Sequence, residues 1–273
     1  MTITISEQFV EAKTDARLCE DLVVVTNDYA AVIDGASDAT GALFDGKAGG
    51  RFAAKAIAAS IGSLDATATG REFADTLTSA LSSAVAEAHG ALSGATRWPA
   101  ATVACVSAHR REFWRIGDCH GVIGGVPYPG GKRVDDAAYG FRAAMNAALA
   151  ETGVALSELI ETDPGYVASR ALIDIQQHLS NKVGTWGFGC VNGTPIPDEY
   201  VEVVSLPPPP TEVILATDGY PVVHPTLRES EAALAEMTSR DPASINELWP
   251  MGKPSRPGAN APDDRTYLRI IVD

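Results

Sequence analysis

The chain has 273 residues, 45% of them hydrophobic and 21% charged, which is usual for a soluble globular protein that can bury a sizeable core. Its 21 Lys and Arg against 35 Asp and Glu give a net charge of −14, and such an acidic surface argues against nucleic-acid binding because it repels phosphate backbones. No apolar run approaches the roughly 18 residues of a membrane span, and no basic stretch precedes an apolar one at the N-terminus, so we expect a cytoplasmic protein without membrane contact.

Apolar patterning predicts the secondary structure along the chain. Strands are expected over 23–25 and 29–33, separated by the polar turn residues 26–28. Helices are expected over 49–64 and 71–92, because both segments place apolar residues at helical spacing. The later elements are, in order, strands within 101–110 and 112–126, helices from about 137 and over 164–178, strands over 199–206 and 211–219, short helices over 228–237 and 242–249, and a strand over 266–273.

This order of elements favours a layered α+β fold. The strands come in groups and do not alternate strictly with helices, which argues against a doubly wound parallel sheet. The chain contains no long linker and no internal repeat, so we expect a single domain over 1–273. Its four cysteines lie far apart and none forms a Cys-x-x-Cys pair, so free thiols are expected rather than disulfides or a zinc site.

Carboxylates stand at the edges of four apolar strands. These are Glu20-Asp21, Asp34, Asp218 and Asp263-Asp264. Taken singly, each is explained by a turn, since Asp-Gly is a favoured turn pair and strands need polar ends. Taken together, they could converge at one rim of a sheet, where they would repel one another unless a cation neutralised them. Oxygen ligands suit magnesium or manganese and not zinc.

The order and spacing of these segments resemble the metal-dependent serine/threonine protein phosphatases of the 2C type, the PPM family, along nearly the whole chain. The matching segments are CEDLVVVTNDYAAVIDG, AGGRFAAKAIAASI, ATVACVSAHRREFWRIGDCHGVIGG, PPTEVILATDGY and DDRTYLRIIV. Each is short and weakly specific, and the resemblance depends on their order. It implies a four-layer α-β-β-α sandwich, in which helix pairs flank two antiparallel sheets.

The resemblance also implies two manganese or magnesium ions. Asp34 would bridge both ions, and the carbonyl oxygen of Gly35 would bind one of them. Asp218 and Asp263 would complete the shell of the other ion, and with Asp34 they are the candidate catalytic residues. Two such ions about 4 Å apart can activate a shared water for attack on phosphorus, without a covalent phosphoenzyme.

Further ligands follow from the same resemblance. Glu20, together with Asp21, would hold the second ion, in part through water. Asp118, in the pair Gly117-Asp118, would either support a third, weaker ion or lie in a turn, and the sequence leaves both possibilities open.

The sequence departs from the family pattern beside the proposed metals. A longer loop over 36–48 carries Asp38 and Asp45, which would be either additional ligands or solvated loop residues. Ala36 stands where some members have a His that acts as the proposed general acid. Three histidines could replace it by residue type alone, namely His109, His120 and His224.

A second departure concerns the substrate phosphate. The family often has an Arg four residues before the acidic Glu, and this position holds Ala16. A one-residue bulge would bring Arg17 into place as the phosphate-binding residue, and Lys13 is the other candidate. The segment 127–182 corresponds to a region that is variable in the family and often forms a flap over the active site.

The leading hypothesis is a metal-dependent phosphatase that hydrolyses phosphoserine and phosphothreonine in proteins. The missing His and the displaced Arg leave open a phosphatase-like scaffold protein with little catalysis. The long loop and the flap leave open a phosphatase of small phosphorylated metabolites. The sequence does not specify the oligomeric state.

Overall fold

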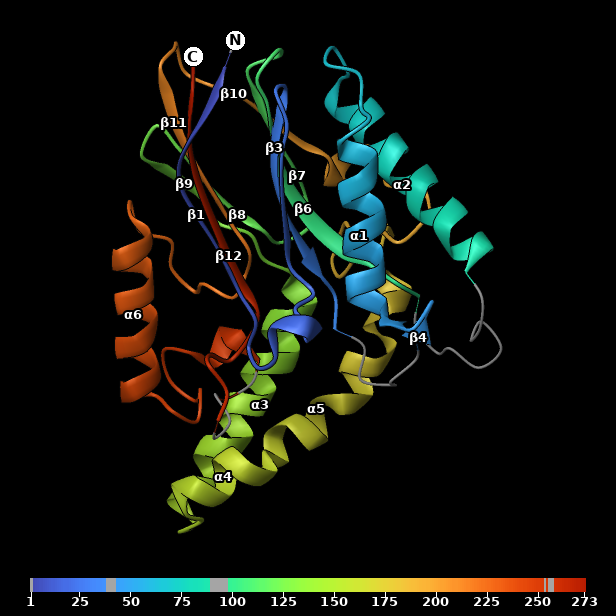
Figure 1. Ribbon diagram of the computed structural model, residues 1–273. Helices are drawn as coiled ribbons and strands as arrows, with labels where there is room; N and C mark the ends of the chain where they lie inside the picture. The colour runs from blue at the N-terminus through green and yellow to red at the C-terminus, as the bar shows by residue number, and fades with distance from the viewer. Residues whose placement is uncertain (1, 38–42, 89–97, 253, 255–257) are drawn as a thin grey trace.

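The computed structural model describes residues 2–37, 43–88, 98–252, 254 and 258–273. Within these residues the chain folds into two five-stranded antiparallel sheets that lie face to face (Figure 1). Sheet I has the strand order β10-β7-β6-β3-β2, and sheet II has the order β1-β12-β11-β8-β9. The strands of sheet I are β2 (Leu22–Val25), β3 (Tyr29–Gly35), β6 (Ala101–Ser107), β7 (Glu112–Ile116) and β10 (Glu202–Ser205). Those of sheet II are β1 (Ile3–Glu11), β8 (His120–Ile123), β9 (Val126–Tyr128), β11 (Thr211–Ala216) and β12 (Arg265–Val272).

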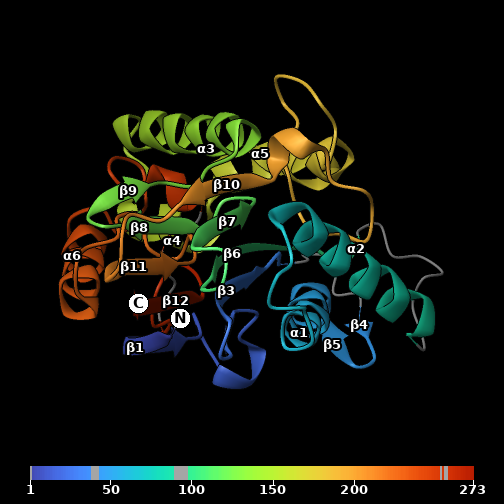
Figure 2. The same cartoon turned by 90° about the horizontal axis from the view of Figure 1, so that it is seen from above.

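Helices cover the outer faces of both sheets and one end of the sandwich. The view in Figure 2 shows α1 (Gly49–Ile61) and α2 (Gly70–Glu87) beside sheet I, and α6 (Leu227–Arg240) beside sheet II. Below the strands in Figure 1 lie α3 (Arg133–Glu151), α4 (Leu156–Thr162) and α5 (Pro164–Ile175). The small elements are β4 (Leu43–Phe44), β5 (Lys47–Ala48) and the 3-10 turns η1 (Ala16–Leu18), η2 (Gln176–Leu179), η3 (Asp198–Tyr200) and η4 (Trp249–Met251).

The apolar run of β3 is explained by its place between two cores. Ala31 and Ile33 pack toward α1 and α2, whereas Ala30 and Val32 pack into the layer between the sheets. Because successive side chains of a strand point to opposite faces, a strand covered on both faces needs apolar residues at every position. The core beneath α6 is smaller and includes Tyr220, Leu234 and Tyr267.

The predicted α+β fold with two antiparallel sheets is confirmed. The helices predicted over 49–64 and 71–92 are α1 and α2, although 89–92 lie outside the described residues. Thr69 and Glu72 form a capping box that sets the start of α2, since each side chain accepts a hydrogen bond from the other's backbone amide. All four cysteines are buried free thiols, as expected.

The helix predicted over 242–249 is wrong. Asp241 instead organises turns in this segment, because its carboxylate accepts hydrogen bonds from the amides of Ile245, Asn246 and Leu248. A side chain that satisfies three nearby amides competes with helical hydrogen bonding. The strand β1, which pairs with β12 from Ile3 to Glu11, was not predicted, although its first four residues alternate between apolar and polar.

We find no helix among the described residues with the length and apolar character needed to cross a bilayer.

Candidate metal centre

Three carboxylates converge where the ends of the two sheets meet. Asp34 is the second-to-last residue of β3, Asp118 lies between β7 and β8, and Asp218 lies just after β11. One carboxylate oxygen from each of the three lies within 4.8 Å of the other two. We call Asp34, Asp118 and Asp218 the acidic cluster. It joins both sheets, because β3 belongs to sheet I and β11 to sheet II.

Asp34-Gly35 is not a hairpin turn, since Gly35 still pairs with Ala101 at the end of β3. Glycine is needed here for close packing, because a Cβ on Gly35 would lie 2.6 Å from the carbonyl carbon and oxygen of Gly50, in the first turn of α1. Gly219 has the same role, since its Cβ would lie 2.1 Å from the carbonyl oxygen of Asp264. Both Asp-Gly pairs therefore mark tight backbone packing beside the cluster.

Gly117-Asp118 lies in a turn, and that turn also brings an acid to the cluster. Gly117 has a φ of 94°, so it forms a turn that favours glycine. The turn nevertheless places the Asp118 side chain, which is buried, in the acidic cluster.

The charges of the cluster are mutually unfavourable. Burial and the charge of Asp218 raise the pKa of Asp34 well above its usual value. Enclosure by protein atoms, followed by the charges of Asp118 and Asp263, raises the pKa of Asp218 to about 7, although this side chain also contacts solvent in a cavity. Burial alone would raise the pKa of Asp118, but the ammonium of Lys132 outweighs it and holds that pKa below its usual value. A divalent cation would relieve the repulsion within the cluster.

A buried oxygen without a partner in the cluster fits such a cation. Among the described residues, Oδ1 of Asp118 is buried and accepts no hydrogen bond, and the same holds outside the cluster for oxygens of Glu20, Asp135 and Gln176. Buried polar atoms are normally satisfied, so an unpaired carboxylate oxygen points to a ligand. The donors around the cluster are carboxylate oxygens, which suit magnesium or manganese.

The other predicted acids take different positions. Asp263 lines the same cavity as the cluster, and its carboxylate lies 2.7 Å from Nζ of Lys13. Glu20 lies behind the cavity wall, where its Oε2 accepts a hydrogen bond from the Ser37 hydroxyl. Asp264, the next residue after Asp263, accepts hydrogen bonds from the backbone amides of Lys13 and Glu20. It therefore links the start of β12 to the segment between β1 and β2.

Asp21 faces the protein interior rather than the cavity. Its Oδ2 accepts hydrogen bonds from the hydroxyls of Thr217, at 2.7 Å, and Thr266, at 2.9 Å. Burial raises its pKa to about 8, despite these two hydrogen bonds. Asp21 therefore connects the segment before β2 to the ends of β11 and β12, and this contact positions Asp218.

The structure does not bring Arg17 to the site. Its side chain is 88% exposed and pairs with Asp15, whose carboxylate also caps η1 through the Arg17 amide. No bulge carries it inward, so the predicted phosphate contact of Arg17 is not supported. Lys13, the other candidate, lines the cavity.

The histidine and loop candidates are mostly outside the cavity. Of the three histidines, His120 lines it, but its Nδ1 accepts a hydrogen bond from the Gly130 amide and burial lowers its pKa, so it is neutral near pH 7. His109 and His224 do not line it. Asp45 lies in the turn between β4 and β5, and Asp38 lies outside the described residues.

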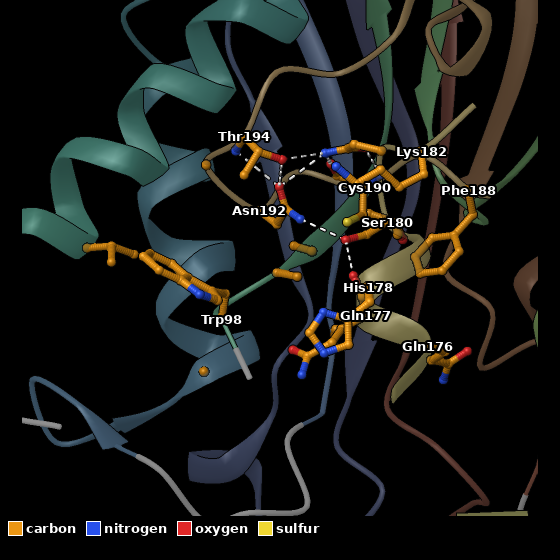
Figure 3. A pocket seen from close by; sticks show the side chains of 18 of the residues that line it. Trp98, Gln176, Gln177, His178, Ser180, Lys182, Phe188, Cys190, Asn192 and Thr194 are labelled. Carbon is orange, nitrogen blue, oxygen red and sulfur yellow. Dashed lines mark hydrogen bonds between the residues drawn. The ribbon is translucent and has the colours of Figure 1, made fainter. Parts of the chain in front are cut away.

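The acidic cluster forms part of the wall of a cavity of about 560 Å³, which we call the acidic cavity. Residues of the variable segment 127–182 also line this cavity, including Asp135, Tyr139 and Tyr166. A second cavity of about 740 Å³ adjoins it, and the two share the lining residues Ala36, Ser37, Thr102, Lys132, Ile173 and Gln176. Figure 3 shows this adjoining cavity, with Trp98 on one side and Gln177, His178 and Phe188 on the other.

Comparisons with known proteins agree with this architecture. No protein-family model matches the sequence, and no curated protein matches it significantly. Among solved structures, the Mycobacterium tuberculosis serine/threonine phosphatase PstP/Ppp superposes with a TM-score of 0.51 at 13% identity, covering 100% of both chains. The serine/threonine phosphatase Stp1 from Staphylococcus aureus gives 0.51 at 10% identity, covering 100% of this chain and 97% of Stp1. PppA, a regulatory component of T6SS in Pseudomonas aeruginosa, superposes with a TM-score of 0.50 at 12% identity, covering 99% of this chain and 97% of PppA. The chain therefore has the fold of the serine/threonine phosphatases PstP/Ppp and Stp1.

Proposed function

We propose that this chain is a metal-dependent phosphatase that hydrolyses phosphoserine and phosphothreonine monoesters with the help of two manganese or magnesium ions. The convergence of the acidic cluster at the edge of a cavity, in a chain with a phosphatase fold, carries this proposal. A phosphate monoester is dianionic and is hydrolysed very slowly without catalysis, so it needs positive charge and an activated water. The surface of a protein with a net charge of −14 does not supply this positive charge. Cations bound by the acidic cluster would supply it at the site itself.

The residues that would hold the ions line the acidic cavity. They are Asp34, the backbone carbonyl of Gly35, Asp218 and Asp263, and the carboxylates of Asp34 and Asp218 lie close together in the acidic cluster. Glu20 would contribute through water, because it stands behind Ser37. Bound divalent ions supply a water of lowered pKa and neutralise the phosphoryl oxygens. Within the protein, Asp21 and Asp264 keep these acids in place through their hydrogen bonds.

The adjoining cavity favours a phosphorylated protein over a small metabolite as the substrate. A phosphoryl group and one side chain fill only part of the acidic cavity, and the shared wall at Ser37, Thr102 and Gln176 leads onward into a larger space. That space offers aromatic surface from Trp98 and Phe188 and amide groups from Gln177 and Asn192. This mixture suits the backbone and side chains of a peptide that flank the phosphorylated residue.

Hydrolysis assays with controlled metal test the proposal. The purified chain should hydrolyse both p-nitrophenyl phosphate and a phosphothreonine peptide with manganese or magnesium, and should lose activity in EDTA. The peptide should give the higher kcat/KM, because only the peptide reaches the adjoining cavity. Activity that persists in EDTA would contradict the two-metal proposal. A folded chain that binds manganese and hydrolyses neither compound would instead favour a phosphatase-like scaffold.

Lys13, and not Arg17, is expected to contact the substrate phosphate. Its ammonium lies at the cavity beside Asp263 and Ser37, whereas Arg17 is held outside by Asp15. Lys13→Gln should raise KM for the peptide about tenfold, the effect of one charge-assisted hydrogen bond. The assay should use saturating manganese, because Lys13 also pairs with Asp263. The matched control Arg17→Gln should leave KM within about a factor of two, and an equal rise in both variants would contradict this assignment.

A further inference from the structure

Lys132 places a positive charge directly on the acidic cluster. It stands at the N-terminal cap of α3, and its Nζ lies 2.5 Å from Oδ2 of Asp118. Asp135, one turn further along α3, lies 3.7 Å from the same Nζ, and the ring of Phe188 lies 5.5 Å away, measured to its centroid. The Lys132 side chain is only 17% exposed. The ammonium is therefore held from several sides and is not a mobile surface charge.

This contact divides the cluster into two unequal parts. Among the described residues, the direct ion pair of Lys132 within the cluster is with Asp118, which has one of its two oxygens occupied by the ammonium, whereas Asp218 feels this charge only from a greater distance. The remaining oxygen, Oδ1, is buried and unpaired, so Asp118 still offers one ligand atom toward the cluster. A divalent cation bound there would lie close to the lysine charge, and like charges at such a distance repel strongly in a buried site.

We propose that the Lys132 ammonium takes the place of a metal ion at Asp118, so that the chain carries a built-in cation there and binds divalent ions only around Asp34 and Asp218. The inference rests on the metal-binding part of the proposed function. It argues against a third ion at Asp118, because it makes this residue the anchor of a lysine. Lys132 also borders both cavities, so its charge stands beside the path of the substrate.

The number of manganese ions bound per chain tests the inference without relying on activity. Equilibrium dialysis and titration calorimetry with manganese should give one additional ion per chain for Lys132→Gln and Lys132→Met compared with the unchanged chain. Both neutral variants are used because glutamine can still donate a hydrogen bond to Asp118 and methionine cannot. Circular dichroism should show that each variant is folded before the ions are counted.

Three further variants assign the additional ion to Asp118. Lys132→Arg keeps the charge and should keep the manganese count of the unchanged chain. The double variant with Lys132→Gln and Asp118→Asn should lose the additional ion again. Lys182→Gln removes a lysine from the adjoining cavity that contacts none of the cluster acids, and it should not alter the count. An unaltered count in both neutral Lys132 variants overturns the inference, and a count of zero in every chain overturns the metal-binding part of the proposed function as well.

Discussion

Asp218→Asn is expected to lower phosphatase activity at least about 1000-fold at saturating substrate and manganese, because a cation at this cluster supplies several kcal/mol of charge stabilisation and each 1.36 kcal/mol corresponds to a factor of ten in rate. Asparagine has nearly the same shape but provides a neutral ligand, so the change removes charge rather than volume. The same variant should unfold at a higher temperature than the unchanged chain in EDTA, because it removes one member of a set of repelling carboxylates. Steady-state kinetics and thermal unfolding followed by circular dichroism measure the two effects.

Asp136→Asn is the matched control for this experiment. Asp136 lines the acidic cavity but lies outside the acidic cluster, so the same chemical change is made in the same cavity. Its activity should stay within about a factor of three, as for a surface charge that contributes little. Near-normal activity in Asp218→Asn, or an equal loss in both variants, would remove Asp218 from the catalytic site.

The metal-free protein is expected to lose stability between pH 6 and pH 9. Burial raises the pKa of Asp21 from 3.8 to about 8, so the folded chain keeps a proton on this group that the unfolded chain has already released. Stabilisation from that proton is complete below pH 4, where both states are protonated, and is lost as the pH rises through the folded-state pKa. Asp21 alone should cost about 2–3 kcal/mol of unfolding free energy over this range.

Urea unfolding in EDTA at pH 6, 7.5 and 9, followed by tryptophan fluorescence, measures this dependence. Asp21→Asn should reduce the loss of unfolding free energy between pH 6 and pH 9 by about 2 kcal/mol, because an amide does not ionise. The rest of that loss is expected from the ionisation of the acidic cluster. Asp198→Asn is the control, since the Asp198 side chain is 92% exposed and should leave the pH dependence unaltered. A loss of the same size in Asp21→Asn and in the unchanged chain would show that Asp21 is not the group responsible.

Much of the fold could be predicted from local patterns. The apolar runs expected as strands over 29–33 and 211–219 became β3 and β11, and the apolar spacing over 71–92 matches α2, because these features depend on residues close in sequence. The segment after Asp241 was misread as a helix because the decisive feature is a side chain that accepts three amide hydrogen bonds, and apolar spacing does not reveal such a contact.

The sequence by itself determined that acids end apolar strands in an order typical of a phosphatase, and it placed Asp34, Asp118 and Asp218 among the candidates. Only the tertiary structure decided what each charged group does. Asp21 turned inward to Thr217 and Thr266, Arg17 stayed outside with Asp15, and Lys13 and Lys132 reached the acidic cavity. The physical reason is distance: Lys13 and Asp263 are 250 residues apart in the chain and 2.7 Å apart in space. A direct ion pair needs its charged atoms within about 4 Å, and strand periodicity carries no information about which charges the fold brings within that range.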